Sequence, residues 1–338
     1  MATTQSKVLV TGGTGILGKR LARRLVEKGY SVRALIRSQS NVAGLKKLNV
    51  DLAFGDLGDQ SSIIAAVEGV DVVVHAAAGT SGTVKEAEIA TIQGTRHVLE
   101  ACRNSGVKKL VYISSCNVYE VVGSTGRQVL TEEAQLERYP LRRGHYSAAK
   151  LRAENMVTKE MNQGKYPIVV LRPGTFYGPG AEVYTRMMGI SLARRIFIVF
   201  GDGKSELPLV HVDNAVDAIL ECLSNSAADN QVFNVVDCDL VTKKMYVERV
   251  VRRLYPNAIV IYFPMPLLLV LTWLQEAVFS IFGKQPPLSV YRLKSSQKRI
   301  GYSTSKIESA IGWWSRKRFE DSAEQLVREQ NREQSETE

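Results

Sequence analysis

The 338-residue sequence has little that indicates export, metal binding or nucleic-acid recognition. No pair of cysteines is closely spaced and no histidine lies at metal-ligand spacing, so neither a disulfide framework nor a metal site is predicted. The opening MATTQSKVLV lacks the basic and apolar stretches of a secretory signal. We therefore expect a cytoplasmic chain with reduced thiols and no metal. The four cysteines are Cys102, Cys116, Cys222 and Cys238.

The formal net charge of +10 also lacks the pattern of a nucleic-acid-binding protein. The basic residues are spread along the chain, and no helix-turn-helix, zinc-finger or RNA-binding motif is present. Nucleic acid is therefore not an expected partner. A basic surface would still favour an anionic cofactor or an anionic membrane.

What the chain does have is a regular alternation in its first half. Short runs rich in β-branched residues are separated by segments of helical period, which predicts an α/β fold with a doubly wound parallel sheet. After about Arg172 the alternation loosens and Gly/Pro turns interrupt it. We expect a main domain over residues 1–172, a smaller substrate-binding lobe over 173–325 with some segments returning to the main domain, and a polar tail over 326–338. The predicted strands are KVLVTG, SVRALIR, VDLAFGD, VDVVVHAA, KKLVYISS and YPIVVLRP.

Three glycines lie directly between the first strand and the first helix, in VLVTGGTGILGKR. At this position Gly12 allows a tight turn, Gly15 lets the backbone approach a pyrophosphate, and Gly18 lets the helix pack closely on the strand. The helix N-terminus then faces the phosphate charge. A turn that needs positive φ would also recruit glycine, but the strand-turn-helix context favours a dinucleotide site.

The spacing TGxxGxxG resembles that of the short-chain dehydrogenase/reductase superfamily, and further motifs follow in the family's order. YISSCNVY resembles the catalytic serine region, YSAAK matches YxxxK, and LRPGTFYGPG, LVHVDNAVDAI and TSKIESAIGWW are similar to the extended branch, the NAD-dependent epimerase/dehydratase family. The apolar segment followed by PPL is similar to 3β-hydroxysteroid dehydrogenase-like members, and the chain also resembles dihydroflavonol reductase-like members. The resemblance implies a Rossmann-type dinucleotide-binding domain over residues 1–172. It implies further cofactor contacts at Ile16, Asp56, Leu57, Ala76, Ala77 and Pro173.

The resemblance implies Ser115, Tyr146 and Lys150 as catalytic residues. Tyr146 and Lys150 are four residues apart, so on a helix they project from one face. A nearby ammonium would favour the phenolate and lower the pKa of Tyr146 from about 10 toward neutrality. We expect Tyr146 to be the general acid/base, Lys150 to tune it and hold the nicotinamide ribose, and Ser115 to hold the substrate oxygen. Its neighbour Ser114 is the less favoured catalyst.

Two positions depart from the extended branch. Thr91 stands where the branch usually has an asparagine, so a role for that asparagine is not carried over. Leu207 stands about where nucleotide-sugar members carry an arginine for the diphosphate. The second departure weakens the nucleotide-sugar interpretation.

The end of the second predicted strand bears on which dinucleotide binds. An NAD site typically presents an acidic residue to the ribose there, whereas an arginine accepts the additional phosphate of NADP. The strand ends at Arg37, and no acidic residue follows before Asp51. NADP is therefore the expected cofactor, with NAD as the alternative.

The apolar run over 264–283 differs from the rest of the chain. Gln275 and Glu276 in its middle argue against a membrane span. It is expected to cover the substrate pocket or a homodimer face. The alternative is a helix resting on a membrane, which the basic residues Arg292, Lys294, Lys298 and Arg299 would suit.

Together these features predict an NAD(P)-dependent oxidoreductase that interconverts a carbonyl and a secondary alcohol on a largely apolar, steroid-like small molecule. The alternative is a nucleotide-sugar epimerase or dehydratase with a tightly held, recycled dinucleotide. The dispersed histidines, His75, His97, His145 and His211, are expected in core or surface roles.

Overall fold

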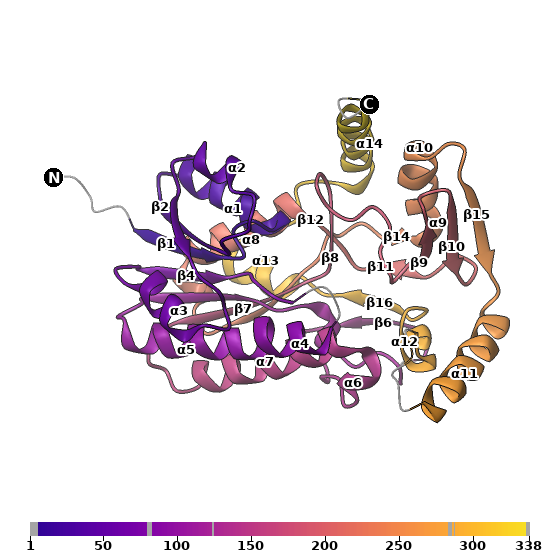
Figure 1. Ribbon diagram of the computed structural model, residues 1–338, viewed down its shortest axis with the longest axis horizontal. Helices are drawn as coiled ribbons and strands as arrows, with labels where there is room; N and C mark the ends of the chain where they lie inside the picture. Colours follow the sequence, from indigo (N-terminus) through magenta and orange to yellow (C-terminus); the bar gives the residue numbers. More distant parts are fainter. Residues whose placement is uncertain (1–5, 80–82, 124, 283–285, 287, 336–338) are drawn as a thin grey trace.

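The computed structural model describes residues 6–79, 83–123, 125–282, 286 and 288–335. Its centre is a seven-stranded parallel sheet in the order β13-β7-β5-β4-β1-β2-β3 (Figure 1). The sheet confirms the predicted α/β class. Its strands were recognisable in the sequence because a strand that is buried on both faces is a continuous apolar run. The strands are β1 (Lys7–Thr11), β2 (Ser31–Ile36), β3 (Asp51–Phe54), β4 (Val72–His75), β5 (Lys109–Ile113), β7 (Ile168–Pro173) and β13 (Val232–Val235).

Helices cover both faces of this sheet (Figure 1). One face is covered by α1 (Ile16–Glu27) and α8 (Val212–Ser224), which pack against each other, with α2 (Ala43–Lys46) and α13 (Ser305–Ile311) beside them. The other face is covered by α3 (Gln60–Val67), α5 (Gly94–Asn104) and α7 (His145–Met161). A π-helical segment (Ala87–Gln93) follows α4 (Val84–Glu86) and leads directly into α5.

The strand order reverses between β1 and β4, which pair with each other. After β1 the next strands, β2 and β3, are added on one side, and after β4 the next strands, β5 and β7, are added on the other side. In doubly wound sheets a ligand binds at such a reversal, beyond the carboxyl ends of the strands. The predicted cofactor residues that follow β1, β2, β3 and β4 are therefore brought to one edge of the sheet.

A smaller set of elements lies beyond the carboxyl edge of the main sheet, on the right of Figure 1. Its three-stranded sheet joins β15 (Ile259–Phe263) parallel to β10 (Ile196–Phe200), and β10 antiparallel to β9 (Gly189–Leu192). The inner side of this sheet packs against four helical elements, and the side chains between them form a second hydrophobic core. The helical elements are α9 (Lys243–Tyr246), the π-helical segment Val247–Val251, α10 (Arg252–Leu254) and α14 (Phe319–Ser335).

Helix α14 continues through much of the region expected to be a polar tail. It extends to Ser335, and its Phe319, Ala323 and Leu326 are buried against the smaller core. Their spacing of four and three residues places them on one helical face.

Short paired strands connect the two parts of the molecule. The pairs are β8 (Thr175–Tyr177) with β12 (Leu209–His211), β11 (Glu206–Leu207) with β14 (Val241–Thr242), and β6 (Arg127–Leu130) with β16 (Arg299–Tyr302).

The apolar run forms helix α11 (Met265–Ile281), directly after β15. It packs on α12 (Val290–Ser295), which in turn contacts α6 (Pro140–Arg143). Most of its apolar side chains are exposed. Gly283, the end of the predicted segment, lies outside the described residues. Within the described part of the chain, no helix has the length and apolarity needed to cross a membrane.

Candidate active site

The turn between β1 and α1 brings the backbone close to the ends of the neighbouring strands. Gly12 has φ +71°, and a Cβ on it would lie 3.0 Å from the Cα of Ala77. Gly15 is the residue that precedes α1, and having no side chain it leaves the first helical N–H groups uncapped. A Cβ on Gly18 would overlap the carbonyl oxygen of Gly12. This glycine-lined helix start fits a pyrophosphate in both space and charge.

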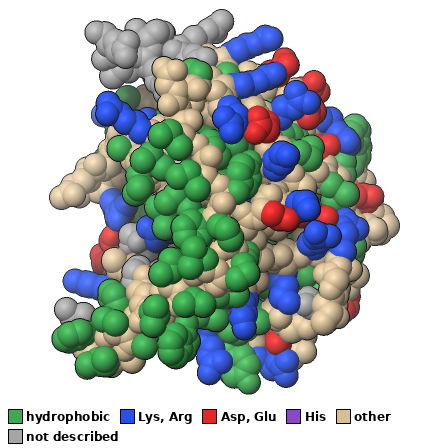
Figure 2. All heavy atoms as spheres, turned by 90° about the vertical axis from the view of Figure 1, so that its right-hand side faces the viewer, with side chains coloured by type: hydrophobic (Ala, Val, Ile, Leu, Met, Phe, Trp, Pro, Cys, Tyr) green, Lys and Arg blue, Asp and Glu red, His purple; other side chains and the backbone are tan. Residues whose placement is uncertain are grey.

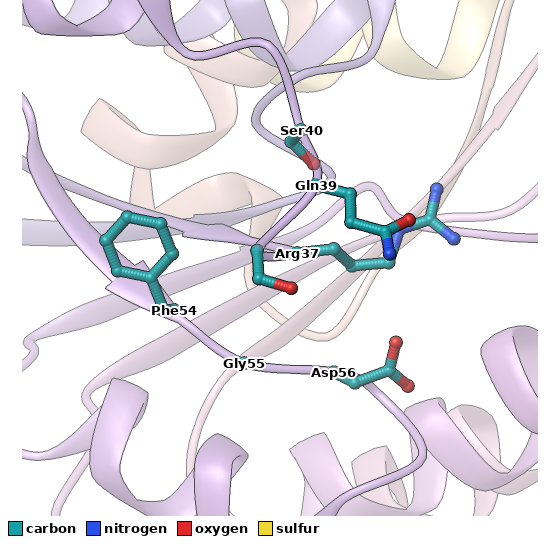
Figure 3. A pocket seen from close by; sticks show the side chains of 7 residues that line it. Arg37, Gln39, Ser40, Phe54, Gly55 and Asp56 are labelled. Carbon is teal, nitrogen blue, oxygen red and sulfur yellow. The ribbon is translucent and has the colours of Figure 1, made fainter.

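A cavity of about 670 Å³ lies where β2 and β3 end (Figure 3). The loop after β2, with Arg37 and Ser38, lies across it from Gly55 and Asp56, which follow β3. Arg37 is exposed at the cavity wall. The structure thus brings together two of the predicted cofactor residues, Arg37 and Asp56, from separate strands.

Asp56 at the cavity and Asp51, the first acidic residue after β2 in the sequence, both accept hydrogen bonds from other groups. The Asp56 carboxylate accepts a hydrogen bond from the Gly58 N–H at 2.8 Å. Asp51 lies at the start of β3 and accepts from Arg33 Nε at 2.7 Å and Lys7 Nζ at 2.9 Å. Asp51 therefore lies away from Arg37, at the opposite end of β3.

The remaining predicted contacts lie at the carboxyl ends of their strands. Ala76 and Ala77 follow β4, and Ala77 N–H donates to Thr11 Oγ1 at 3.2 Å. Pro173 ends β7. Leu57 is buried beneath α5, where a Cβ on Gly94 would lie 2.7 Å from the Leu57 Cβ. Ile16 is the first residue of α1 and is partly exposed.

Ser115 and Tyr146 meet where β5 ends and α7 begins, and the Ser115 side chain lies close enough to exert a lowering effect on the pKa of Tyr146. Ser115 Oγ also accepts the N–H of Asn117 at 3.1 Å. The Asn117 N–H occupies an acceptor position of the Ser115 oxygen, so the hydroxyl proton of Ser115 is available to donate to another group. The pair therefore presents a donor and an acid/base hydroxyl side by side.

Lys150 lies one helical turn after Tyr146 and is buried. Its Nζ donates to the carbonyl oxygen of Ile113 at 2.7 Å and lies 5.3 Å from the ring centre of Tyr112. Burial lowers the pKa of Lys150 to about 8, while the nearby Glu154 carboxylate raises it. Lys150 is thus anchored at the end of β5, close to the Ser115 loop.

The pKa of Tyr146 differs from the expectation drawn from the YxxxK spacing. Burial raises it above the ordinary value, and the hydrogen bond with Ser115 acts in the opposite direction. The Lys150 ammonium, which was expected to lower this pKa, is directed instead at the Ile113 carbonyl. In the protein without bound cofactor, burial therefore has a larger effect on the pKa of Tyr146 than the Lys150 charge, which the YxxxK spacing suggested would lower it.

A buried ion pair joins α7 to β7 and was not foreseen from the sequence. Arg172 Nη2 lies 2.6 Å from Glu154 Oε1, and Arg172 Nη1 donates to the hydroxyl of Tyr119 at 2.7 Å. Ser114 donates its hydroxyl to Glu154 as well. Ser114 is therefore part of this support, in keeping with Ser115 being the favoured catalyst. The only sequence signal was that Glu154 lies four residues after Lys150.

His75 also lies at the core of the site rather than at its surface. Its Nδ1 is 2.7 Å from Thr11 Oγ1 and its Nε2 is 3.1 Å from Thr95 Oγ1. Burial, with a smaller contribution from the Lys150 charge, lowers the pKa of His75 to about 3. A neutral imidazole thus ties β1, β4 and α5 together beneath the dinucleotide turn. The two threonines gave no sequence signal.

The two positions that depart from the extended branch have structural roles. Thr91 lies in the π-helical segment, where its Oγ1 accepts the Gly79 N–H at 2.9 Å and its carbonyl oxygen accepts the Thr95 hydroxyl at 2.6 Å. Leu207 is buried in the smaller hydrophobic core. No guanidinium is supplied at that position for a diphosphate.

The geometry is suited to moving a proton next to a bound dinucleotide. The glycine turn fits the pyrophosphate, the Arg37 cavity fits the adenosine end, and Ser115, Tyr146 and Lys150 lie toward the other end, where β5 terminates. When bound, a nicotinamide ring would supply or accept hydride. Ser115 would orient the reacting oxygen and Tyr146 would exchange its proton.

Comparison with known proteins yields matches along most of the chain. A sequence profile of the "NAD dependent epimerase/dehydratase family" matches residues 8–236. The 2-alkyl-3-oxoalkanoate reductase of Stenotrophomonas maltophilia is 35% identical over 234 residues, 66% of this chain and 67% of that protein. The decarboxylating sterol-4-alpha-carboxylate 3-dehydrogenase of Dictyostelium discoideum is 25% identical, over 94% of this chain and 99% of its own. The crystal structure of gox2253 has a TM-score of 0.80 at 22% identity and covers 98% of this chain and 99% of its own.

Proposed function

The chain belongs to the NAD-dependent epimerase/dehydratase family, the extended branch of the short-chain dehydrogenases/reductases, and from this premise we propose an NADP-dependent oxidoreductase. It interconverts a carbonyl and a secondary alcohol on a largely apolar substrate, with steroids as the first class to test. The observation that carries this proposal is the placement of Ser115 beside Tyr146, one helical turn from Lys150. All three groups needed for proton exchange at a carbonyl oxygen are present.

In the reducing direction, Ser115 donates a hydrogen bond to the substrate carbonyl oxygen. Tyr146 then delivers its phenolic proton to that oxygen as the carbon is reduced. Lys150 is held at the Ile113 carbonyl one turn behind Tyr146, and from there its positive charge offsets part of the charge of the tyrosinate that remains. Asn117 supports this step because its N–H fixes the direction of the Ser115 hydroxyl.

Two observations support an apolar substrate over a nucleotide sugar. Leu207 is buried in the smaller core and offers no charge to a diphosphate. In their names, the two relatives described above act on a 2-alkyl-3-oxoalkanoate and on a sterol carboxylate. Both are molecules with a large apolar part.

The preference for NADP is supported by Arg37. It lines the cavity that follows β2, where an arginine can accept the additional phosphate of NADP. Asp51, the next acidic residue in the sequence, is engaged by Arg33 and Lys7. No acidic side chain from the end of β2 competes for the ribose hydroxyls.

A substrate screen tests the proposal. Purified protein is mixed with NADPH and a panel of apolar ketones, including 3-oxosteroids, and in parallel with nucleotide sugars, while NADPH consumption is followed by absorbance. Net NADPH oxidation with ketones is expected. Conversion of a nucleotide sugar with no net change in the cofactor would support the epimerase alternative instead.

A further inference from the structure

Helix α11 presents an uncharged, apolar outer surface. The side chains that point outward recur at three- and four-residue spacing, as on one face of a helix. Except for Ser280, every exposed side chain of α11 is apolar, and Trp273 and Ile281 are 61% and 80% exposed. The outward stripe consists of Leu267, Val270, Leu271, Leu274, Val278 and Ile281.

The two polar residues in the middle of α11 are turned inward. Gln275 Nε2 donates to the carbonyl oxygen of Leu288 at 2.8 Å. Glu276 Oε1 accepts the N–H of Val290 at 3.0 Å, at the start of α12. The polar groups that argue against a membrane span therefore fasten α11 to the protein and leave its outer stripe uncharged.

The sheet that precedes α11 has a second apolar outer surface. Its inner side chains, such as Phe197 and Val199 of β10, pack on the smaller core, while the alternate residues face outward. Cross-strand register aligns the outward residues in two rows of three. The rows are Leu192, Ile196 and Ile259, and Ile190, Ile198 and Ile261.

The outer surfaces of this sheet and of α11 lie on the same side of the molecule and together form what we name the apolar face. Figure 2 shows hydrophobic side chains gathered in a continuous band on this side, with Lys and Arg side chains along its borders. Monomeric soluble proteins rarely expose apolar patches of more than a few hundred Å² without a function. The apolar face is therefore an interaction surface.

The charges around the apolar face favour an anionic partner. Arg194 and Arg195 are exposed in the turn that joins Leu192 to Ile196, and Lys294 is exposed on α12. The whole chain carries +10. A second copy would bring the same positive groups toward one another, whereas an anionic lipid surface would complement them and would accept an apolar helix with an exposed tryptophan.

We propose that the apolar face lies on the surface of an anionic lipid bilayer, with the outer stripe of α11 and the outward residues of β9, β10 and β15 in the interfacial layer. This placement does not depend on the proposed reaction. It adds a lipid surface as a partner of the protein.

Vesicle flotation tests the proposal with full-length protein and no substrate. One set of vesicles contains phosphatidylcholine alone and the other contains phosphatidylcholine with phosphatidylserine. The wild-type protein is expected to float with the anionic vesicles, and less with them when the salt concentration is raised. Absence from both floating fractions at low salt would overturn the proposal.

Substitutions distinguish the apolar face from nonspecific adsorption. Leu271→Glu combined with Leu274→Glu is expected to weaken vesicle binding at least about tenfold, because two apolar side chains leave the lipid. The matched control is Ile64→Glu, an exposed aliphatic residue on α3, and it should bind as the wild type does. Replacing Arg194 and Arg195 with glutamine should weaken binding about fivefold for each charge. Thermal unfolding and NADPH binding verify that each variant is folded.

Two results would overturn the proposal. Unchanged vesicle binding by the double glutamate variant would show that another surface contacts lipid. A stable dimer in size-exclusion chromatography that the same variant dissociates, without vesicle binding by the wild type, would assign the apolar face to a second copy.

Discussion

At the residue scale, the hydroxyl of Ser115 decides how the proposed catalytic pair of Ser115 and Tyr146 is oriented. The Asn117 N–H donates to Ser115 Oγ, so the Ser115 proton is directed away from the backbone and toward the position shared with Tyr146. Burial keeps Tyr146 protonated and burial lowers the pKa of Lys150. The site is therefore set to donate a proton from Tyr146, which is the step that carbonyl reduction requires.

Tyr146→Phe tests this role. Removing the phenolic proton should lower turnover of an apolar ketone by about 10²- to 10⁴-fold, the usual contribution of general acid/base catalysis. Affinity for NADPH, measured by fluorescence titration, should stay nearly unchanged because the ring remains. Tyr30→Phe, next to the end of α1, is the control and should behave as wild type. Full turnover by Tyr146→Phe would exclude the proposed mechanism.

Arg37→Ala tests the cofactor preference. The wild type should bind NADPH at least several-fold more tightly than NADH, since the guanidinium faces the cavity that follows β2. The alanine variant should lose this preference, mainly through weaker NADPH binding. Titration of both cofactors against both proteins measures the ratio. Equal wild-type affinities, or a preference that survives the substitution, would contradict the assignment.

At the scale of elements, the junction of β1 and α1 depends on the absence of a side chain at Gly18. The helix start lies against the carbonyl of Gly12, and a methyl group there would meet backbone that cannot move independently. This close approach keeps the first turn of α1 directed at the end of β1. The shape of the proposed dinucleotide cradle is therefore a property of the packing as well as of the glycine motif.

Gly18→Ala should displace α1 from the cradle and weaken NADPH binding about tenfold or more, because the amides that face the pyrophosphate are shifted. Gly44→Ala is the matched control, since a Cβ on Gly44 meets nothing within 4 Å. That variant should bind NADPH like the wild type. Fluorescence titration and urea unfolding follow both effects. Equal binding by the two alanine variants would show that the close approach does not matter.

The sequence was sufficient to predict the elements of the main sheet and not the contacts between them. The apolar runs predicted six of its strands. The strand β13 was not among the predicted strands, because it lies in the part of the chain after Arg172, where turns interrupt the alternation of strands and helices. The Glu154–Arg172 pair joins positions on α7 and β7 that only the folded chain brings together.

The same limit applied to α11. Its sequence predicts an apolar helix, but the spacing of apolar residues does not determine which side of the helix packs on the protein and which side faces outward. The structure supplies that information, because the inward hydrogen bonds of Gln275 and Glu276 fix which side of the helix faces outward.

At the scale of the whole molecule, the buried histidine beneath the site affects stability at low pH. The pKa of His75 is about 3 in the folded state, below its ordinary value of 6.5. Its neutral form therefore contributes fully to stability above pH 6.5, and this contribution is lost as the pH falls toward about 3, because the unfolded chain binds a proton that the folded chain excludes. Asp237 acts in the opposite sense below pH 6, since burial raises its pKa to about 6.

His75→Gln isolates this contribution. Between about pH 6 and pH 4, the free energy of unfolding of the variant should fall less steeply than that of the wild type, by about 1.4 kcal/mol per pH unit, the value of one proton. Urea unfolding at several pH values measures the two slopes, and the contribution of Asp237 cancels in their difference. Parallel slopes would mean that His75 is protonated in the folded protein.

The central claim is that the chain passes reducing equivalents from NADPH to the carbonyl of an apolar substrate. The most direct measurement uses NADPH carrying deuterium at the transferable position of the nicotinamide, with product analysis by mass spectrometry on the ketones that pass the substrate screen. We predict one deuterium in each alcohol formed and one NADP⁺ for each alcohol. Alcohol without deuterium, or turnover of nucleotide sugars alone with the labelled cofactor unchanged, would contradict the claim.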